Sequence, residues 1–421
     1  MKQNEKELRC GLIGEYLGHS FSPEIHRFLA DYSYGLYEIK RGEVGEFMRS
    51  TDLTAFNVTI PYKKDVIPYL DEISAVAHRI GAVNTVTRTK TGGFRGDNTD
   101  YYGFLKMVEA SGISVKNKKI LVLGTGGASV TVHTVLSDLG ARETVSVSRT
   151  GPCNYETVYL LHKDADVIVN TTPVGMYPNT GASPLRLTEF SNLSGVLDLI
   201  YNPGRTALLL EAEHLGLPYA NGLLMLVAQA KRASELFLGG TEIADERIQF
   251  ITREIRRKTE NLVLVGMPGC GKSTAARLLS SLTGREAIDT DEAFISLSGG
   301  KTPAEYIREY GESAFRHIES EAVRAVGKLS GKIIATGGGV PTIRENYDAL
   351  HQNGVILWLK RPLSSLSTEG RPLSQGQNLD ALYEKRRPFY EAFADGSVDS
   401  CNDPMDTAEA LLKKFEKLIS L

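Results

Sequence analysis

The chain has little of several features that mark specialised classes of protein. Four cysteines occur in 421 residues, far apart and without metal-ligand spacing. This excludes a disulfide-stapled mini-protein and favours reduced thiols in a cytoplasmic protein. Lys and Arg total 48 against 51 Asp and Glu, and no block of five like charges occurs. We therefore expect no nucleic-acid or anionic-membrane partner, and any phosphate recognition must be local.

Long apolar runs are also missing. No stretch approaches the roughly 20 apolar residues of a membrane span, and the charged start MKQNEKELRC is not typical of a secretion signal. The apolar content of 42 % and the charged content of 24 % are ordinary for a globular protein. We expect a soluble cytoplasmic protein whose length suits about two or three domains.

Strand-like apolar runs alternate with helix-length segments in three successive series. The first ends near Val86 and includes the run LTAFNVTI and a helical pattern over 63–80. The second begins at KKILVLG and ends in the helical stretch GLLMLVAQAKRASELF, which we expect to return and pack on the first series. The third begins at NLVLVG after a charged helical pattern. This alternation predicts crossover connections, mostly parallel sheets and an α/β fold.

A phosphate-binding loop opens the third series. Gly266-Met-Pro-Gly-Cys-Gly-Lys-Ser273 matches GxxxxGK[ST] between an apolar strand and a helix. Its glycines let backbone N–H groups turn toward phosphate oxygens at a helix N-terminus. Lys272 is expected to reach the β- and γ-phosphates, and the Ser273 hydroxyl to ligate Mg²⁺. For Cys270, a small residue that fits the loop is a better interpretation than a redox switch. The predicted ATP-binding residues here are Gly266, Gly269, Cys270, Gly271, Lys272, Ser273 and Thr274.

A second glycine-rich loop opens a helix in the second series. Gly124-Thr-Gly-Gly-Ala-Ser129 departs from GxGxxG because Ser129 replaces the third glycine. The next strand ends in Arg149-Thr150, where NAD-binding folds carry a carboxylate. A guanidinium at this point can bind the 2′-phosphate of NADP. The alternative is that Arg149 is a solvated surface arginine.

Polar side chains of the first series gather at strand ends and helix starts. Lys63, Asn84 and Asp100 lie at such positions, where open α/β sheets bind ligands. Ser20 and Ser22 can cap a helix or donate to an anionic or polyol ligand. Taken singly, each is more often a cap or a surface charge. Taken together, a Lys–Asp pair beside a nicotinamide can exchange a proton with a substrate hydroxyl while hydride leaves its carbon.

These motifs make residues 8–257 resemble shikimate dehydrogenase. The matches are SxSP at 20–23, NVTxPxK at 57–63, AVNT at 82–85, GDNTD at 96–100, GxGGA at 124–128, NTTPVGM at 170–176, DLIYNP at 198–203 and NGLxMLVxQA at 221–230. The resemblance implies reversible, NADP-dependent reduction of 3-dehydroshikimate to shikimate. One departure is Ser148, where the family usually has the Asn of its NRT motif.

The same resemblance implies residue roles. The catalytic pair would be Lys63 and Asp100. The residues holding shikimate would be Ser20, Ser22, Thr59, Asn84, Tyr201 and Gln229. Those holding NADP would be Gly124, Gly126, Gly127, Ala128, Arg149, Thr150, Thr171, Gly222 and Met225.

Carboxylates and arginines follow the phosphate-binding loop. Asp289-Thr-Asp291 ends a strand, and carboxylates at alternate positions can serve different tasks, one near Mg²⁺ and one accepting from a substrate hydroxyl. Arginines suit a carboxylate-bearing substrate and a charge-rich phosphoryl transition state. As isolated residues, most of them would be surface ion-pair partners. The arginines concerned are Arg316, Arg371 and Arg386.

As a set, these features make residues 261–421 resemble shikimate kinase. The resemblance implies transfer of the ATP γ-phosphoryl group to the shikimate 3-hydroxyl. Asp291 would orient and deprotonate that hydroxyl, and Asp289 would support Mg²⁺ through water. Lys272 and Arg371 would complete the catalytic set, with Arg371 on a lid that also contacts ATP. The residues holding shikimate would be Asp291, Arg316, Gly338, Gly339 and Arg386, with Arg387 as an alternative to the last.

We therefore predict a bifunctional enzyme of aromatic amino-acid and chorismate biosynthesis that uses NADP(H), ATP and Mg²⁺. The predicted domains are an α/β shikimate-binding domain (1–103 and 222–257), a Rossmann NADP domain (104–221), a linker (258–260) and a P-loop kinase domain with a parallel sheet (261–421). The partners are small-molecule substrates, and a homodimer through the dehydrogenase part stays open. The rivals are a quinate/shikimate dehydrogenase using NAD fused to a small-molecule kinase, and a catalytically dead shikimate sensor.

Overall fold

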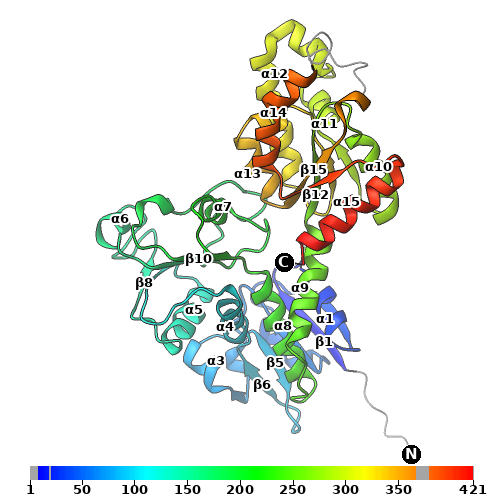
Figure 1. The fold of residues 1–421 in the computed structure, drawn as a ribbon. Helices are drawn as coiled ribbons and strands as arrows, with labels where there is room; N and C mark the ends of the chain where they lie inside the picture. Colours follow the sequence, from blue (N-terminus) through cyan, green and yellow to red (C-terminus); the bar gives the residue numbers. More distant parts are fainter. Residues whose placement is uncertain (1–7, 19, 367–378, 421) are drawn as a thin grey trace, which may run out of the picture. The chain divides into compact units, whose positions relative to one another are not determined.

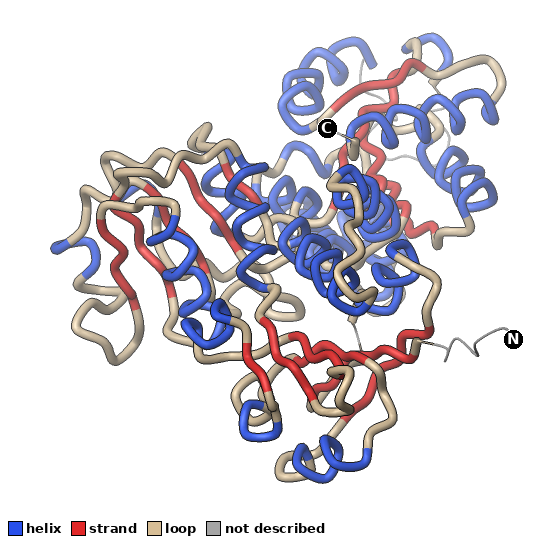
Figure 2. Tube along the Cα trace, turned by 90° about the horizontal axis from the view of Figure 1, so that it is seen from below, coloured by secondary structure: helices blue, strands red, loops and turns tan. Residues whose placement is uncertain are grey.

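The computed structural model describes residues 8–18, 20–366 and 379–420, which form two compact units (Figures 1 and 2). The N-terminal unit comprises Met1–Val174, Pro184–Tyr201 and Glu211–Thr252. The C-terminal unit comprises Gly175–Ser183, Asn202–Leu210 and Arg253–Leu421. Three sheets are present in the described residues, as the three strand series predict.

The first sheet of the N-terminal unit has the order β2-β1-β3-β5-β6-β4. Its strands are β1 (Arg9–Gly14), β2 (Ser33–Glu38), β3 (Ala55–Val58), β4 (Glu72–Ile73), β5 (Thr85–Arg88) and β6 (Phe94–Asp97). β5 pairs antiparallel with both β3 and β6. The other three pairs of this sheet are parallel, as expected for a mostly parallel sheet. β5 is the exception, because a short turn joins it directly to β6 and leaves no room for a crossover helix.

The helical pattern over 63–80 is not one helix. It divides into a 3₁₀ turn (Ile67–Tyr69), β4 and α3 (Ala75–Ile80). Pro68 lacks a backbone donor, which disfavours a continuous helix through it. Ser74 then starts a new helix, because its side chain accepts a hydrogen bond from Ala77 N.

The second sheet is parallel and has the order β11-β10-β9-β7-β8. Its strands are β7 (Lys119–Leu123), β8 (Glu143–Val147), β9 (Val167–Asn170), β10 (Gly195–Asp198) and β11 (Tyr219–Ala220). Every residue of β7, β9 and β10 is buried. Burial on both faces explains why these strands read as continuous apolar runs.

Helices flank both sheets of this unit. They are α1 (Ser22–Leu29), α2 (Val44–Ser50), α3, α4 (Asp100–Ser111), α5 (Gly127–Asp138), α6 (Val158–Leu161) and α8 (Leu223–Phe237). Two further helices, α7 (Ala207–His214) and α9 (Glu246–Thr259), contain residues of both units. α8 packs on α1, α4, β3 and β5. Its Ala233 and Phe237 share a buried cluster with Cys10 of β1 and Ala55 of β3. The expected return of this helix to the first series is confirmed.

The C-terminal unit has one parallel sheet of order β13-β14-β12-β15-β16. Its strands are β12 (Asn261–Val265), β13 (Ala287–Asp289), β14 (Ile333–Ala335), β15 (Gly354–Lys360) and β16 (Gly396–Asp399). α9 runs to Thr259 and β12 begins at Asn261, so the segment expected to be a linker is mostly the last turn of a helix.

Helices cover both faces of this sheet (Figure 1). They are α10 (Lys272–Thr283), α11 (Thr290–Leu297), α12 (Pro303–Gly327), α13 (Glu345–His351), α14 (Leu379–Phe393) and α15 (Pro404–Leu418). α10 and α15 share one buried cluster with the sheet, and α12, α13 and α14 share another. α12 kinks at Gly311, which has φ +84°. The central strand β12 leads directly into the phosphate-binding loop.

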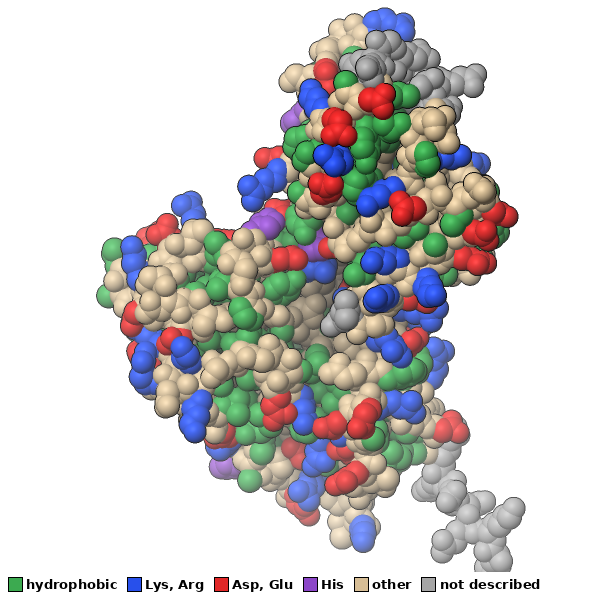
Figure 3. Space-filling model, viewed as in Figure 1, with side chains coloured by type: hydrophobic (Ala, Val, Ile, Leu, Met, Phe, Trp, Pro, Cys, Tyr) green, Lys and Arg blue, Asp and Glu red, His purple; other side chains and the backbone are tan. Residues whose placement is uncertain are grey.

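The surface carries both signs of charge. On the face shown in Figure 3, Lys and Arg side chains lie among Asp and Glu side chains over both units. This mixture agrees with a formal net charge of −3. Within the described ranges, no helix is both long enough and apolar enough to cross a membrane.

Candidate active sites

The N-terminal unit holds a cavity of about 410 Å³ at the ends of several elements. Thr59 and Lys63 follow β3, Asp100 begins α4, Tyr201 follows β10 and Gln229 lies on α8. The polar lining comprises Tyr16, Ser20, Ser22, His26, Asn57, Thr59, Lys63, Asn84, Asp100, Tyr201 and Gln229. The structure therefore brings together all eight residues that the sequence assigned to catalysis and shikimate binding in this half.

A short ion pair lies in this cavity. Lys63 Nζ lies 2.6 Å from Asp100 Oδ2, and the two side chains are 25 % and 7 % exposed. They are the only Lys, Arg, Asp or Glu among the described residues that line the cavity. A partly buried pair of this kind fixes the Lys63 side chain in one place beside the Asp100 carboxylate.

Buried amides connect the elements around the ion pair. Asn84 Oδ1 accepts a hydrogen bond of 2.7 Å from Thr99 N, next to Asp100, and Asn84 Nδ2 donates to Gln229 Oε1 at 3.2 Å. Asn57 Nδ2 donates to the backbone oxygen of Asn84. The side chains on β3, α4 and α8 are thus held by one hydrogen-bond network.

Neither Ser20 nor Ser22 occupies the N-cap position of the helix that follows them, although Ser20 accepts from its first N–H. The N-cap position of α1 is Phe21, which makes no side-chain capping bond. Ser20 Oγ accepts from Ser22 N, and the two hydroxyls are 3.1 Å apart. Of the two functions that the sequence left open, the structure favours a pair of hydroxyls facing the cavity.

A buried histidine behind the cavity was missed by the sequence analysis. His26 is 1 % exposed, its Nδ1 lies 2.6 Å from the hydroxyl of Tyr32, and its ring stacks on Tyr34 at 3.9 Å. Tyr34 in turn donates to Asn57 Oδ1. Burial lowers the pKa of His26 to about 3, so the imidazole is neutral around pH 7 and supports the amide network without adding charge.

Replacing His26 with Gln is expected to flatten the acid side of the stability profile of the N-terminal unit. Its pKa is about 3 when folded and about 6.5 when unfolded. At a pH between these values, the unfolded wild-type chain binds one more proton than the folded chain. The free energy of unfolding of the wild-type protein therefore falls as pH drops from about 6.5 toward 3, by about 4 kcal/mol in total. Urea unfolding across this pH range, with hydrogen exchange of β1 and α8 amides to assign the transition, measures the slope. An equal slope in both proteins would contradict the buried neutral histidine.

Burial raises the pKa values of the facing Tyr32 and Tyr34 hydroxyls, which therefore stay neutral over this pH range.

The glycine-rich loop after β7 lies beside the end of β8. Gly124 N donates to Val147 O, and Gly124 has φ +99°. A Cβ at Gly124 would lie 3.0 Å from Thr171 Oγ1, so this close approach and this backbone both require glycine. Gly126 is the N-cap of α5, and nothing lies within 4 Å of the Cβ positions of Gly126 and Gly127. The start of α5 is open to a phosphate-bearing ligand.

The other predicted NADP residues occupy different surroundings. Arg149 and Thr150 follow β8 and are exposed, and Ala128 lies in the first turn of α5. Arg149 makes no ion pair with any described carboxylate, which leaves its guanidinium available. Gly222 is the N-cap of α8. Met225 is 6 % exposed and packs in the core against α4, so the structure does not bring its side chain to the loop.

The C-terminal unit holds a larger cavity, of about 630 Å³, above the carboxyl end of β12. The predicted residues that line this cavity are Gly269, Gly271, Lys272, Ser273, Thr274, Asp289, Asp291, Arg316, Gly338, Gly339 and Arg386. Arg371 lies outside the described residues. Arg387 is exposed and pairs with Glu384, so Arg386 is the arginine of this cavity.

The phosphate-binding loop has the predicted backbone. Gly266, Gly269 and Gly271 all have positive φ, and Gly271 is the N-cap of α10. Lys272 Nζ donates to the backbone oxygens of Gly266 and Met267 at 2.9 and 3.1 Å. Cys270 is 1 % exposed and packs into the core below the loop, which favours its interpretation as a small residue that fits.

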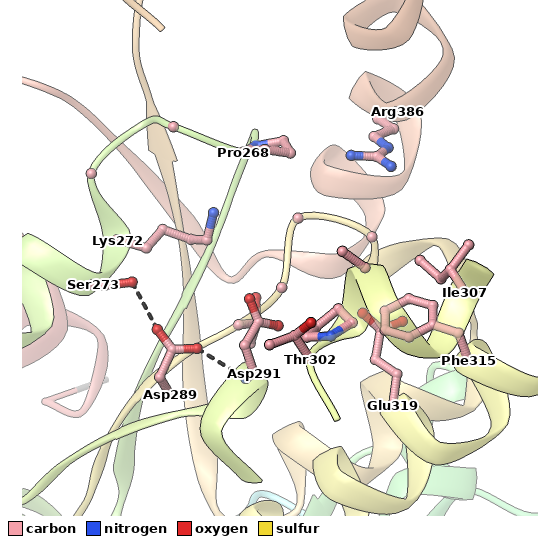
Figure 4. Close-up of a pocket in the computed structure, with 18 of the residues that line it drawn as sticks. Pro268, Lys272, Ser273, Asp289, Asp291, Thr302, Ile307, Phe315, Glu319 and Arg386 are labelled. Atoms are coloured by element: carbon pink, nitrogen blue, oxygen red, sulfur yellow. Dashed lines mark hydrogen bonds between the residues drawn. The ribbon is translucent and has the colours of Figure 1, made fainter. Parts of the chain in front are cut away.

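Three side chains after the loop provide oxygen atoms (Figure 4). Ser273 Oγ donates to Asp289 Oδ2 at 2.7 Å, and Asp289 Oδ1 accepts from Asp291 N at 3.0 Å. Mg²⁺ prefers hydroxyl, carboxylate and phosphate oxygens, so Ser273 and Asp289 fit the predicted metal site. Asp291 lies two residues after Asp289, in the first turn of α11, and both carboxylates line the cavity.

Arg316 and Glu319 form a buried pair on α12. Arg316 Nη1 lies 2.6 Å from Glu319 Oε2, and Arg316 Nη2 lies 3.2 Å from Glu312 Oε1. Burial raises the pKa of Glu319, and the nearby Arg316 opposes this shift. A Cβ at Gly339 would collide with the Arg316 guanidinium, so a larger residue there would have to displace that side chain. Glu319 was not selected from the sequence, although its i,i+3 spacing from Arg316 was a usable signal.

Arg386 reaches the cavity from α14 (Figure 4). It is 7 % exposed, and its Nη1 is buried without a hydrogen-bond partner in the described part of the chain. An unsatisfied donor on a buried guanidinium is costly and suits an anionic ligand. Tyr390, one turn later on α14, donates to Gly338 O at 2.7 Å. This bond holds Gly338 in place beside Pro268.

Comparison with known proteins gives matches for both units. A model of the shikimate dehydrogenase substrate binding domain matches residues 12–86, and a model of shikimate kinase matches residues 268–416. A shikimate dehydrogenase (NADP(+)) from Clostridium perfringens is 38 % identical over 253 residues, which cover 54 % of this chain and 92 % of that protein.

Solved structures resemble the dehydrogenase-like part. A chorismate mutase/shikimate 5-dehydrogenase fusion protein from Clostridium acetobutylicum is 36 % identical with a TM-score of 0.56, covering 60 % of this chain and 98 % of that one. A quinate dehydrogenase from Corynebacterium glutamicum in complex with NAD is 26 % identical with a TM-score of 0.53, covering 57 % and 97 %.

Proposed function

Because the chain belongs to the shikimate dehydrogenase family and its residues 268–416 form a shikimate kinase domain, we propose that it is a bifunctional enzyme. It reduces 3-dehydroshikimate to shikimate with NADPH and then phosphorylates the 3-hydroxyl of shikimate with ATP. The observation that carries this proposal is a pair of cavities, one with a Lys–Asp pair and one with a phosphate-binding loop, each lined to hold a small hydroxylated acid.

Reduction at C3 needs a hydride on the carbon and a proton on its oxygen. NADPH supplies the hydride. The Lys63 ammonium supplies the proton to the C3 oxygen as negative charge develops there. Asp100, at 2.6 Å from Lys63 Nζ, holds the Lys63 amine in position for this transfer. In the reverse direction, Lys63 accepts the hydroxyl proton as hydride leaves C3.

The remaining polar lining of the N-terminal cavity orients the ring. The Ser20 and Ser22 hydroxyls, with Tyr201, suit the substrate carboxylate, because each can donate a hydrogen bond to it. Thr59, Asn84 and Gln229 suit the ring hydroxyls. Asn84 and Gln229 are already hydrogen-bonded to each other, so little side-chain entropy is lost when the substrate binds.

NADP rather than NAD is the proposed cofactor, since the exposed Arg149, which follows β8, has no carboxylate partner among the residues that the structure describes. The open start of α5 would hold the pyrophosphate, and Arg149 and Thr150 the 2′-phosphate. The rival, quinate with NAD, would require a carboxylate near this point to accept from the ribose hydroxyl, and the sequence SRT has none.

Replacing Arg149 with Ala is expected to lower the preference for NADPH over NADH. A charge-assisted hydrogen bond is worth about 1.5–3 kcal/mol, so the ratio of kcat/KM values for the two cofactors should fall by about 10- to 100-fold. The measurement is initial rates of 3-dehydroshikimate reduction with each cofactor. A ratio unchanged in Arg149→Ala would identify Arg149 as a solvated surface residue.

Phosphoryl transfer in the C-terminal cavity needs a positioned hydroxyl and neutralised charge. Asp291 accepts the proton of the 3-hydroxyl as its oxygen attacks the γ-phosphorus, and the bond to the ADP oxygen breaks. Lys272 exchanges its backbone carbonyl partners for phosphate oxygens. Arg386 and Arg316 bind the shikimate carboxylate, and Glu319 keeps Arg316 in place. Ser273 and Asp289 would hold Mg²⁺, which would neutralise phosphate charge.

The domain boundaries are part of the proposal. A shikimate-binding domain (1–103 and 222–257), an NADP domain (104–221) and a kinase domain (261–421) follow the three sheets and the return of α8. We also place the enzyme in the cytoplasm, a proposal supported by NADPH and ATP as substrates and by four unpaired cysteines. A homodimer through the dehydrogenase part stays a prediction.

Two assays test the proposal. NADPH absorbance should fall when 3-dehydroshikimate is added, and ADP should form when shikimate and Mg-ATP are added. Turnover of quinate with NAD but not of shikimate with NADP would support the first rival. Binding of shikimate without turnover in either assay would support the catalytically dead sensor, against which Lys63, Asp100, Lys272, Ser273 and Asp291 all argue.

A further inference from the structure

Arg361 lines the C-terminal cavity but takes no part in the mechanism derived above. It is the first residue after β15, and β15 pairs in parallel with β12, the strand that leads into the phosphate-binding loop. The end of β15 is close enough to the loop that a Cβ at Gly266 would lie 2.5 Å from Leu359 O. Because β15 pairs with β12, the residue that follows β15 lies next to the phosphate-binding loop.

The Arg361 guanidinium reaches the loop at Gly271. A Cβ at Gly271 would lie 3.6 Å from Arg361 Nη1, which is ordinary contact distance. Gly271 is the N-cap of α10 and directly precedes Lys272. The backbone N–H groups of this stretch are the ones that turn toward phosphate oxygens. Arg361 thus lies at the phosphate end of the cavity, and Arg316 and Arg386 come from α12 and α14.

The charges around Arg361 are unbalanced when no anion is bound. Arg316 is paired with Glu319, and the Lys272 ammonium donates to two backbone oxygens. Arg361 is exposed and forms neither an ion pair nor a side-chain hydrogen bond with any residue that the structure describes. Two cations beside the positive end of α10 repel each other until an anion lies between them.

We propose that Arg361 binds the phosphate chain of the nucleotide, opposite Lys272, as a further nucleotide-binding residue of the kinase site. The inference rests on the proposed kinase function. A planar guanidinium can donate two parallel hydrogen bonds to phosphate oxygens. It can do so while Lys272 contacts other oxygens of the same chain, so the two cations share the charge of one ligand.

Substitution of Arg361 separates this role from a general effect on the fold. In Arg361→Ala, the Kd of Mg-ADP and the KM for ATP should rise by about 10- to 100-fold, with the KM for shikimate nearly unchanged. Arg361→Lys should recover part of the loss, since a point charge replaces a fork of donors. The effect should shrink as salt is raised, because the site is open to solvent. Arg387→Ala, an exposed arginine paired outside the cavity, is the matched control and should behave as wild type.

Competition with fragments of the nucleotide identifies the contact. Inorganic tripolyphosphate should lose affinity for Arg361→Ala by a factor similar to that for Mg-ADP, and adenosine should lose none. Loss of adenosine affinity with unchanged tripolyphosphate affinity would mean that the guanidinium packs on the base and would overturn the proposal. Unchanged affinity for all three probes would identify Arg361 as a surface arginine, which also overturns it.

Failure of the kinase function would give a different result. If wild-type protein forms no ADP with shikimate, the proposed function of this unit is wrong, but Mg-ADP binding still tests Arg361. If wild-type protein phosphorylates shikimate and Arg361→Ala matches it in Mg-ADP affinity and in KM, the function stands and the inference about Arg361 is wrong. Dehydrogenase activity of the same sample calibrates the amount of folded protein.

Discussion

Replacement of Lys63 with Met is expected to lower kcat/KM for 3-dehydroshikimate reduction by about 10²- to 10⁴-fold, with ATP-dependent phosphorylation of shikimate unchanged. Methionine fills much of the space of the lysine stem but provides no proton for the C3 oxygen. Lys63 is the only Lys or Arg among the described residues that line the cavity, so no neighbour can replace it. The measurement is NADPH oxidation at varied substrate concentration, alongside ADP formation in the same preparation.

Two further variants make the Lys63 result specific. Lys64→Met changes the adjacent, exposed lysine outside the cavity and should leave both activities intact. Lys63→Met leaves Asp100 buried without its cation, which is destabilising. The double variant with Asp100→Asn should therefore recover thermal stability and remain inactive as a dehydrogenase. A Lys63→Met protein that is folded and within tenfold of wild-type activity would contradict the proposed proton donor.

Replacement of Asp291 with Asn is expected to lower kcat for shikimate phosphorylation by about 10²- to 10⁴-fold, with little change in the KM for Mg-ATP. The amide keeps the size of the side chain, but it cannot take the proton of the 3-hydroxyl. Asp291 lines the cavity, and its backbone N–H is held by Asp289 at 3.0 Å. The measurement is ADP release at saturating shikimate and ATP.

Asp289→Asn should have a different signature. Because Asp289 accepts from the Ser273 hydroxyl and is the proposed support of Mg²⁺, its loss should raise the requirement for Mg²⁺ and the KM for Mg-ATP. Glu292→Gln alters an exposed carboxylate next to Asp291 that does not line the cavity and is the matched control. Equal effects of Asp289→Asn and Asp291→Asn on kcat and KM would show that the two carboxylates do not divide the work as proposed.

Much of the architecture could be read from the sequence, because the strongest signals are local. The parallel sheet of the C-terminal unit and the phosphate-binding loop follow from buried apolar runs and from glycines that need positive φ. The antiparallel pairing of β5 was not predicted, because it depends on the short connection to β6, which leaves no room for a crossover helix. The division of 63–80 into three elements depends on Pro68 and on the capping bond of Ser74, which a helical period does not register.

The sites divide in a similar way. Side chains carried by motif spacing, such as Lys63 and Asp100, could be paired before their 2.6 Å contact was known. His26 and Arg361 could not be selected, because their roles depend on long-range packing: His26 on a network joining separate elements, and Arg361 on the register of β15 against β12. The core position of Met225 could not be read from its motif either, and its assignment to the NADP site stays a prediction.

The central claim is that the N-terminal cavity reduces the C3 ketone to a hydroxyl and that the C-terminal cavity phosphorylates this same hydroxyl. A single reaction with 3-dehydroshikimate, Mg-ATP and NADPH deuterated at both C4 positions tests it most directly, with products identified by mass spectrometry. The account predicts shikimate 3-phosphate that carries one deuterium, on the carbon bearing the phosphate. Deuterated shikimate that accumulates without phosphate, or no consumption of either NADPH or ATP, would contradict it.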